Sequence, residues 1–172
     1  MNTLAPLRTI APQSFRSAYR QVPGPVAVVL TRTETGTVVG ITCTSATSLS
    51  ADPAMATFSV DVKTSFLGSL EATRVFSVNY LAADRVDVAR AFARGGDDLA
   101  RIAHLIVSDP ITSIPTLGSG TVAVLQCELD ATLRCGDHDL VTGAIVRSRY
   151  HGDETALVYS GGAYGAFLAR SY

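Results

Sequence analysis

Residues 123–135, AVLQCELDATLRC, carry the clearest periodicity in the chain. Apolar or small side chains occupy every second position, namely Ala123, Leu125, Cys127, Leu129, Ala131, Leu133 and Cys135. This alternation predicts a long strand with one buried face. Cys127 and Cys135 share that face, but eight residues at about 3.3 Å each separate them by roughly 26 Å, too far for a disulfide.

Other apolar runs predict further strands on both sides of this segment. Leu140–Tyr150 is the expected antiparallel partner of the long strand, and Ala156–Tyr159 closes the set. Val26–Leu30 and Thr37–Thr42 predict a hairpin that turns at Glu34–Gly36. Two more candidate strands are Ala56–Val60 and Val75–Leu81.

The predicted helices are few and short. They are Ser14–Gln21 with Ser14 as N-cap, Ser65–Ala72, a helix capped by Asp84 that buries Val88, Ala89 and Phe92 and stops at Gly95-Gly96, and Asp97–Ile106. Six or more strands at short spacing, with helices inserted irregularly, favour a mainly β fold built as an antiparallel barrel over a doubly wound parallel sheet. No GxGxxG motif follows a strand, which agrees with this prediction.

The composition of the 172 residues fits one soluble globular domain, expected over residues 13–172. Hydrophobic residues make up 47% and charged residues 17%, and the net charge is −1, so the chain has no broad attraction for nucleic acid or membranes. Residues 1–12 lack the layout of a secretory signal and are expected to form a flexible arm. Three scattered cysteines, Cys43, Cys127 and Cys135, indicate buried thiols in a reducing cytoplasm.

The segment Gly40–Pro53, GITCTSATSLSADP, is unusually rich in hydroxyl groups. Such side chains and the nearby backbone N–H groups can bind the carbonyls, ring nitrogens and phosphate of a planar cofactor without adding charge. The alternative is an edge strand that runs into a polar turn.

Lys63-Thr64-Ser65 stands at the expected start of a helix, where free N–H groups and the helix dipole favour an anion. Arg94, which precedes two glycines, could add a second positive contact. The alternative is an ordinary helix cap beside a lysine.

The run Gly136-Asp137-His138-Asp139 lies at the turn between the two longest predicted strands. In an extended chain Asp137 and Asp139 face one way and His138 the other, which disfavours a metal site. At the mouth of a barrel, His138 could instead stack on a ligand or hydrogen-bond to it. No serine stands in a GxSxG-type turn, so a Ser-His-Asp hydrolase has no support.

Eight segments in register resemble one known family. They are FRSAYRQVPGPVAVV (15–29), GITCTSATSLSADPA (40–54), KTS (63–65), FSVNYL (76–81), AFARGGDD (91–98), AVLQCEL (123–129), GDHDLVTGAIV (136–146) and LVYSGGAYG (157–165). In this order they resemble the flavin reductase family of the FMN-binding split barrel, small NAD(P)H:flavin oxidoreductases that often serve two-component monooxygenases. The similarity runs from Phe15 to Phe167.

The resemblance implies a split β-barrel that binds FMN or FAD and takes NAD(P)H as co-substrate. It implies that His138 lies near the nicotinamide and the flavin face, as the catalytic residue. The implied flavin-binding residues are Thr42, Cys43, Thr44 and Ser45 along the ring, Thr47 and Ser48 toward the ribityl chain and phosphate, and Lys63, Thr64, Ser65, Phe92 and Arg94 at the phosphate or adenosine side. A homodimer, and a partner monooxygenase that receives reduced flavin, are also implied.

Several positions depart from the family's pattern. Thr44 stands where many members carry Asn, Ala54 where a second Pro is usual, and Asp98 where Lys is common. Leu99–Pro110 is aliphatic and helical in pattern, and Ser160–Ala163 lacks a frequent basic residue. These departures leave two alternatives open: a split barrel that binds flavin or another planar ligand without nicotinamide turnover, and a cofactor-free repurposed barrel.

Overall fold

The computed structural model describes residues 9–168 of the chain, without the side chain of Asp97. Its helices are α1 (Pro12–Tyr19), α2 (Phe66–Thr73), α3 (Val86–Arg94) and α4 (Asp97–Ile102), followed by a 3-10 turn, η1 (Ala103–Leu105). Its strands are β1 (Gly24–Pro25), β2 (Ala27–Arg32), β3 (Val38–Cys43), β4 (Thr47–Ala51), β5 (Ala54–Asp61), β6 (Val75–Leu81), β7 (Ile106–Ser108), β8 (Pro115–Leu117), β9 (Thr121–Cys135), β10 (His138–Tyr150), β11 (Leu157–Ser160) and β12 (Ala163–Ala166). The predicted mainly β, antiparallel architecture is confirmed.

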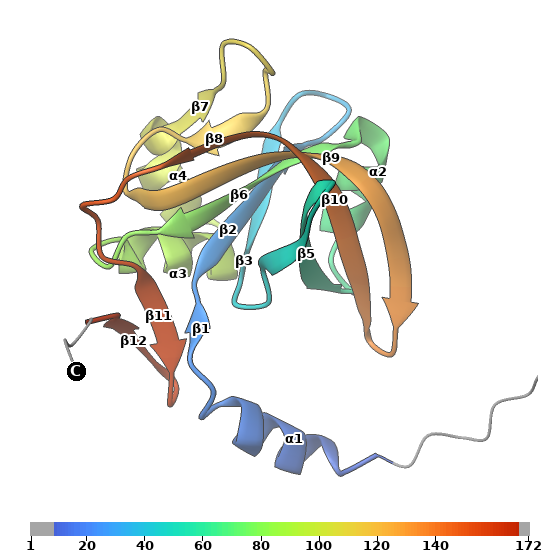
Figure 1. Cartoon of the computed structure of the whole chain (residues 1–172), viewed down its shortest axis with the longest axis vertical. Coiled ribbons are helices and arrows are strands. Elements are labelled where there is room, and N and C mark those ends of the chain that lie inside the picture. Colours follow the sequence, from blue (N-terminus) through green and yellow to red (C-terminus); the bar gives the residue numbers. More distant parts are fainter. Residues whose placement is uncertain (1–8, 169–172) are drawn as a thin grey trace, which may run out of the picture.

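A seven-stranded sheet in the order β3-β2-β6-β9-β10-β5-β4 forms the body of the molecule, and every neighbouring pair in it is antiparallel (Figure 1). The sheet curls, because its two edge strands β3 and β4 are consecutive in the chain and are joined by residues 44–46. The Ser45 hydroxyl accepts a hydrogen bond from the Ser59 backbone N–H at 3.0 Å, which ties the end of β3 to β5. The barrel is split between its edge strands.

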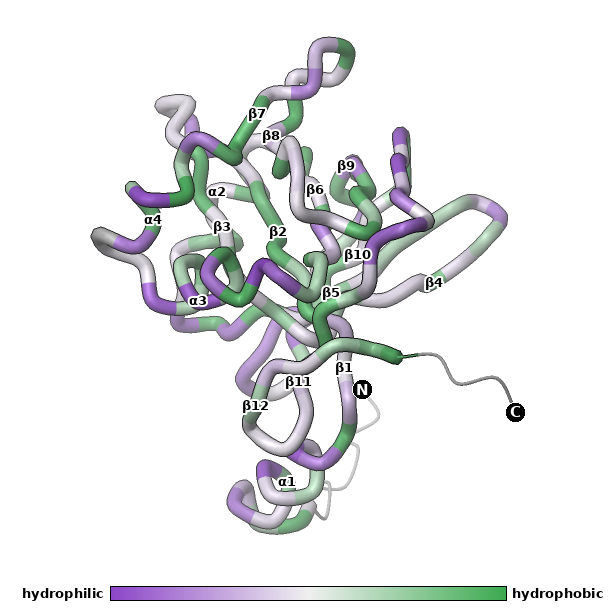
Figure 2. The backbone as a smooth tube through the Cα atoms, turned by 90° about the vertical axis from the view of Figure 1, so that its left-hand side faces the viewer, coloured by the Kyte–Doolittle hydropathy of each residue, from purple (hydrophilic) through white to green (hydrophobic). Residues whose placement is uncertain are grey.

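Two apolar clusters pack on opposite faces of the sheet. Inside the barrel, Phe58 and Phe76 meet edge to face with ring centroids 5.4 Å apart. Outside it, Leu30 packs against Phe92 of α3. The central strand β2 contributes to both clusters and lies among the hydrophobic stretches at the centre of Figure 2. Its aliphatic sequence is therefore that of a strand buried on both faces.

The long strand of the periodic segment is confirmed as β9, but its burial differs from the prediction. Cys127 and Leu129 are buried, whereas residues 131–135 are exposed and Leu133 is 62% exposed. The reason is that the β9–β10 hairpin extends past the core and curves away from the body (Figure 1). Gln126, on the face expected to be polar and exposed, is buried because it donates to Asp109 at 2.9 Å.

Both helix caps named above are wrong. Helix α1 begins at Pro12 after an Ala11 N-cap, so Ser14 lies inside the helix; proline is well suited to a first helical turn. Helix α3 has Arg85 as N-cap, and Asp84 contacts the Arg85 side chain at 3.6 Å instead of capping the backbone. The predicted helix over residues 97–106 ends as α4 at Ile102, and Ile106 already belongs to β7.

The remaining expectations concern termini, thiols and membranes. Most of the expected arm, residues 1–8, lies outside the described residues, and Pro12 belongs to α1. All three cysteines are free thiols, but only Cys127 is buried; the prediction of burial is wrong for Cys135, which lies on the exposed end of β9. Within residues 9–168, no helix has the length and apolar character needed to cross a bilayer.

Candidate functional site

Two adjoining cavities run along β3. The first, which we call the β3–β10 cavity, has a volume of about 390 Å³ and lies between the end of β3 and the start of β10. The second, the β3–α4 cavity, has a volume of about 700 Å³ and extends from the start of α2 to α4 and β7. Ile41 and Thr64 line both cavities, so the two lie next to each other, and each has a volume in the range typical of small-molecule sites.

The hydroxyl-rich segment forms one wall of the β3–β10 cavity through residues 42–45. The Thr42 hydroxyl donates to the Ala89 carbonyl at 2.7 Å, which fixes the end of β3 to α3. Ser45 is held by its two bonds to the backbone of Ser59. Thr44 is exposed, and its hydroxyl has no hydrogen-bond partner among the described residues, so it is available to a ligand.

Cys43 stands in the same wall, between the two threonines. Burial raises the pKa of its thiol, and the hydrogen bond with Ser45 offsets this only in part. The thiol is therefore neutral near pH 7, and its contribution to the cavity is a weakly polar surface without charge.

The start of α2 joins the two cavities. The Thr64 hydroxyl accepts a hydrogen bond from the Phe66 N–H at 3.2 Å, and the Lys63 N–H donates to the Asp61 carboxylate at 2.9 Å. Ser65 makes no side-chain cap bond and lines the β3–α4 cavity. The Thr64 N–H donates to the Asp61 carbonyl at 3.1 Å, so the N–H groups of residues 63, 64 and 66 are all used within the turn. The Ser65 hydroxyl is the polar group that this end of α2 presents to that cavity.

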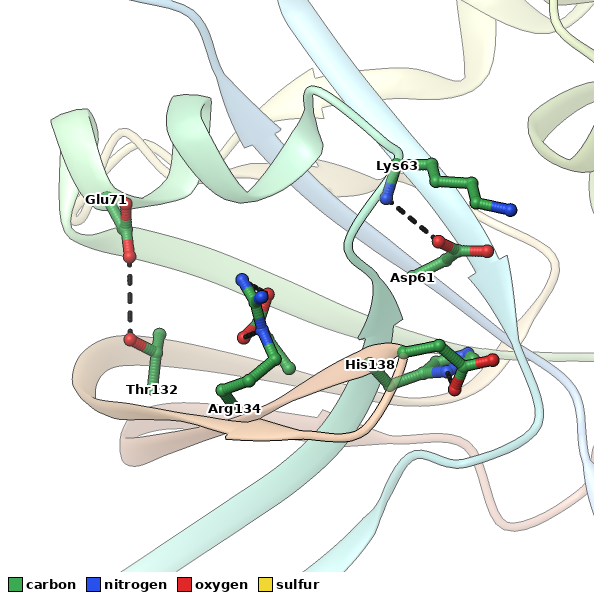
Figure 3. Close-up of polar contacts among 8 residues, drawn as sticks. Asp61, Lys63, Glu71, Thr132, Arg134 and His138 are labelled. Atoms are coloured by element: carbon green, nitrogen blue, oxygen red, sulfur yellow. Dashed lines mark hydrogen bonds and ion pairs between the residues drawn. The ribbon is translucent and has the colours of Figure 1, made fainter.

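His138 closes the β3–β10 cavity from the opposite side. It is the first residue of β10 and pairs in register with Asp61, the last residue of β5. Its Nδ1 lies 2.8 Å from the Asp137 carboxylate, and this hydrogen bond is the main reason that the pKa of Asp137 is lowered. Figure 3 shows the side chains of Asp61, Lys63 and His138 projecting to the same side. With Nδ1 bonded to Asp137, Nε2 is the ring nitrogen left for a ligand.

Asp139 is separated from this arrangement. Its buried carboxylate receives two hydrogen bonds from Arg134, at 2.7 and 3.3 Å, across the β9–β10 hairpin. No group of three potential metal-ligating side chains forms among the described residues. The Arg134–Asp139 pair fixes the hairpin directly beside His138 (Figure 3).

Helix α3 contributes to the β3–α4 cavity through Phe92, whose ring lies against β3. Gly40 makes this contact possible, because a Cβ at position 40 would lie 2.7 Å from the ring. Arg94, near the end of the same helix, lines neither cavity along β3 and faces two other cavities.

The structure therefore brings together most of the predicted site residues. Thr42, Cys43, Thr44, Ser45, Thr64 and His138 line the β3–β10 cavity, and Thr64, Ser65 and Phe92 line the β3–α4 cavity. Four lie outside both linings: Thr47, Ser48, Lys63 and Arg94. Thr47 and Ser48 belong to the exposed edge strand β4, which matches the alternative interpretation for that part of the segment.

Several lining residues were not predicted as site residues. Ser59, Val60 and Asp61 enter through the pairing of β5 with β10, and Leu99, Ala103 and Ile106 through α4, η1 and β7. Asp61 could have been found, because it directly follows the predicted strand Ala56–Val60 and stands two residues before Lys63. Leu99, Ala103 and Ile106 reach the cavity only through tertiary packing, so no local pattern in the sequence marked them as site residues.

Comparison with known proteins agrees with this geometry. Residues 19–167 match the model of the flavin reductase like domain, which is most of the chain. The chain therefore belongs to the flavin reductase-like family.

Individual relatives cover nearly the same span. A flavin reductase of Pseudomonas putida is 29% identical over 160 residues, which are 93% of this chain and 92% of the relative. An NADH:riboflavin 5'-phosphate oxidoreductase of Streptomyces pristinaespiralis is 34% identical over 140 residues, 81% of this chain and 78% of the relative. Among solved structures, BorF, the flavin reductase component of a bacterial two-component tryptophan halogenase, superposes with a TM-score of 0.82 at 26% identity, covering 93% of this chain and all of that one.

Proposed function

We propose that this protein is an NAD(P)H:flavin oxidoreductase that reduces FMN or FAD. The observation that carries the proposal is the β3–β10 cavity, in which a neutral, hydroxyl-rich strand end faces the ring of His138. Family membership and relatives named as NADH-dependent flavin or FMN oxidoreductases support it.

The residues present fit a flavin. The β3–β10 cavity combines the exposed hydroxyl of Thr44 with the apolar surface of Ile41 and Val60, as a planar ring with polar edges requires. The start of α2 offers the hydroxyls of Thr64 and Ser65 and the favourable end of the helix dipole to a phosphate between the two cavities. A bound flavin supplies the redox chemistry, accepting at N5 the hydride and its two electrons from C4 of the nicotinamide.

The chain itself supplies orientation. The free hydroxyl of Thr44 would hydrogen-bond the ring edge, and Ser45, whose hydroxyl is bonded to the Ser59 backbone, would hold this strand end in place. His138 covers the open side of the cavity with a ring whose orientation Asp137 fixes through Nδ1. Together these residues would orient a bound flavin and shield one side of its ring from water.

The direct test is oxidation of NADH by the purified protein, followed at 340 nm with and without added FMN or FAD. The proposal expects oxidation that depends on added flavin. Bound flavin without oxidation of NADH or NADPH would favour the flavin-binding alternative. If the protein binds no flavin, the remaining hypothesis is a cofactor-free repurposed barrel.

The flavin-binding alternative has one specific observation in its favour. Asp98, which stands where the family commonly has Lys, lines neither cavity along β3 and instead contacts Arg101 of α4 at 3.2 Å. Asp98 therefore pairs with the positive charge of Arg101 within α4. Nicotinamide binding without that Lys would depend on other groups.

We further propose that reduced flavin passes to a partner monooxygenase, that the protein is a homodimer and that it works in the cytoplasm. The halogenase reductase component BorF and reductase components of oxygenase systems among the relatives support a partner enzyme. Helix α1 has no buried residue and exposes Phe15 and Tyr19, which supports burial of this helix by a second copy. Free cysteines agree with a reducing compartment.

A further inference from the structure

Helix α3 has a second functional surface on the side opposite Phe92. Two cavities open there: one of about 570 Å³ between α3 and the β11–β12 hairpin, and one of about 360 Å³ between α3 and α4. Arg90 and Arg94 line both, so these two side chains form their common wall. Neither arginine lines a cavity along β3.

This surface concentrates positive charge in a chain of net charge −1. Arg85 and Arg101 join Arg90 and Arg94 around the smaller cavity, against two carboxylates, Asp87 and Asp98. Asp98 is already paired with Arg101. Among the described side chains, no carboxylate forms an ion pair with Arg90 or Arg94.

Arg90 and Arg94 lie four residues apart on α3, and Asp87 and Asp98 in the same lining balance only part of the positive charge around them. Residues four apart on a helix are neighbours on its surface, and like charges at that spacing destabilise the helix. Two guanidinium groups at this separation can instead hold one phosphate between them, with charge-assisted hydrogen bonds.

The larger cavity adds an aromatic wall. Tyr159 and Tyr164 are directly opposite each other in the β11–β12 pair, with ring centroids 5.2 Å apart. The guanidinium carbon of Arg90 lies 5.8 Å from the Tyr164 ring centroid, and Val86 and Ala93 complete an apolar lining. Flat aromatic and apolar surfaces of this kind accept a heteroaromatic base.

The β11–β12 turn that carries this wall is anchored to the rest of the chain. The Gly161 N–H donates to the Arg20 carbonyl at 2.7 Å, and the Arg20 Nε donates back to the Gly161 carbonyl at 3.2 Å. The tyrosines therefore stand on a hairpin whose position relative to α3 is constrained.

We propose that this surface is a second binding site, for a nucleoside phosphate, with the base against Tyr159 and Tyr164 and the phosphate between Arg90 and Arg94. Binding of a free nucleotide here would be independent of flavin reduction, whereas binding of the adenosine end of a dinucleotide substrate rests on the proposed function. Its ligand is either the adenosine phosphate end of a dinucleotide substrate or a free nucleotide, because both present the same chemistry.

The test is calorimetric titration of the full-length protein with ADP, adenosine and inorganic phosphate at low salt. We expect ADP to bind more tightly than either fragment. The double variant Arg90→Gln/Arg94→Gln should lose at least about tenfold in ADP affinity. The control is Arg16→Gln, which removes one exposed charge from α1 and should bind ADP like the wild type.

The outcomes separate this site from the flavin site. Displacement of ADP by FMN, equal ADP affinity in the double variant, or equal affinity for ADP and inorganic phosphate would each overturn the proposal. A double variant that retains FMN affinity while losing ADP supports it. Because ADP binding is measured without turnover, a protein that fails to oxidise NADH can still pass this test.

The KM for NADH distinguishes the two possible ligands, the adenosine end of the dinucleotide substrate and a free nucleotide. If the site holds the adenosine end of the donor, the double variant raises this KM by about the same factor as it weakens ADP binding. An unchanged KM with weakened ADP binding assigns the site to a free nucleotide.

Discussion

At the scale of single residues, His138 is the side chain on which the proposed chemistry depends most. Its Nδ1 is occupied by Asp137 and its ring closes the β3–β10 cavity. In His138→Ala we expect flavin reduction to slow on the order of tenfold, about 1.4 kcal/mol in barrier, with a smaller change in flavin affinity. Anaerobic stopped-flow reduction of bound flavin by NADH measures this step. An unchanged single-turnover rate would remove His138 from the mechanism.

Ser65 tests the phosphate end of the site. In Ser65→Asp a negative charge stands at the start of α2 beside the proposed phosphate, so we expect flavin affinity to fall by about tenfold or more. Ser69→Asp is the matched control, because it adds the same charge to α2 at a position that lines neither cavity. Fluorescence titration with FMN compares the two, and equal affinities would show that the phosphate lies elsewhere.

The three cysteines should react with a thiol reagent in a fixed order. Cys135 is exposed, burial raises the pKa of Cys43, and burial raises the pKa of Cys127 to about 12. With Ellman's reagent at pH 8 we expect one fast thiol, one slow thiol and one that reacts only on unfolding. Bound flavin should slow the second thiol further, because Cys43 lines the cavity; a rate independent of flavin would argue against that location.

At the scale of elements, Asp109 holds the β7–β8 connection against β9. Its carboxylate accepts hydrogen bonds from Gln126 and from the Ile111 and Thr112 N–H groups, which lower its pKa from 3.8 to about 2, the Gln126 bond contributing most. A lowered pKa in the folded state means that ionised Asp109 stabilises the fold above about pH 4, and this stability is lost as the pH falls toward 2.

The corresponding measurement is the urea midpoint between pH 5 and pH 2. The midpoint of the wild type should fall across this range, and Asp109→Asn should show a flatter profile that starts from a lower stability at pH 5. Parallel profiles for the two proteins would show that Asp109 does not contribute to the acid sensitivity.

The sequence predicted the bounds of an element most accurately where its residues fit only one type of secondary structure. Val75–Leu81 was predicted with the bounds of β6, because β-branched and aromatic residues fill a central strand that is buried almost throughout. The helix over residues 97–106 was predicted too long, because aliphatic residues such as Ile106 satisfy both a helix face and a short strand. Residues 131–135 of β9 kept the alternation without burial, since nothing in a local pattern says how far the core extends.

At the scale of the whole molecule, the site forms where the curled sheet fails to close. Residues 42–45 at the end of β3 face His138 only because the sheet curls, which brings β3 near β10 although three strands separate them in the strand order. The sequence marked the hydroxyl-rich segment and His138 by their chemistry, and the family resemblance related them. The sequence could not predict that Ser59 and Val60 of β5 or the residues of α4 line the cavities, because these linings depend on the packing of distant segments.

The proposed homodimer also belongs to this scale. Light scattering after gel filtration should give twice the 18.0 kDa of one chain. Phe15→Glu/Tyr19→Glu places two charges on the exposed face of α1 and should shift the protein toward the monomer, whereas a dimer unaffected by these changes would exclude α1 from the interface.

The most direct test of the account is a crystal structure of the protein with bound flavin. We predict that the flavin ring lies in the β3–β10 cavity within hydrogen-bond distance of residues 44–45, with its phosphate at the start of α2 and His138 beside the ring. A flavin bound elsewhere on the molecule, with this cavity empty, would contradict the central claim.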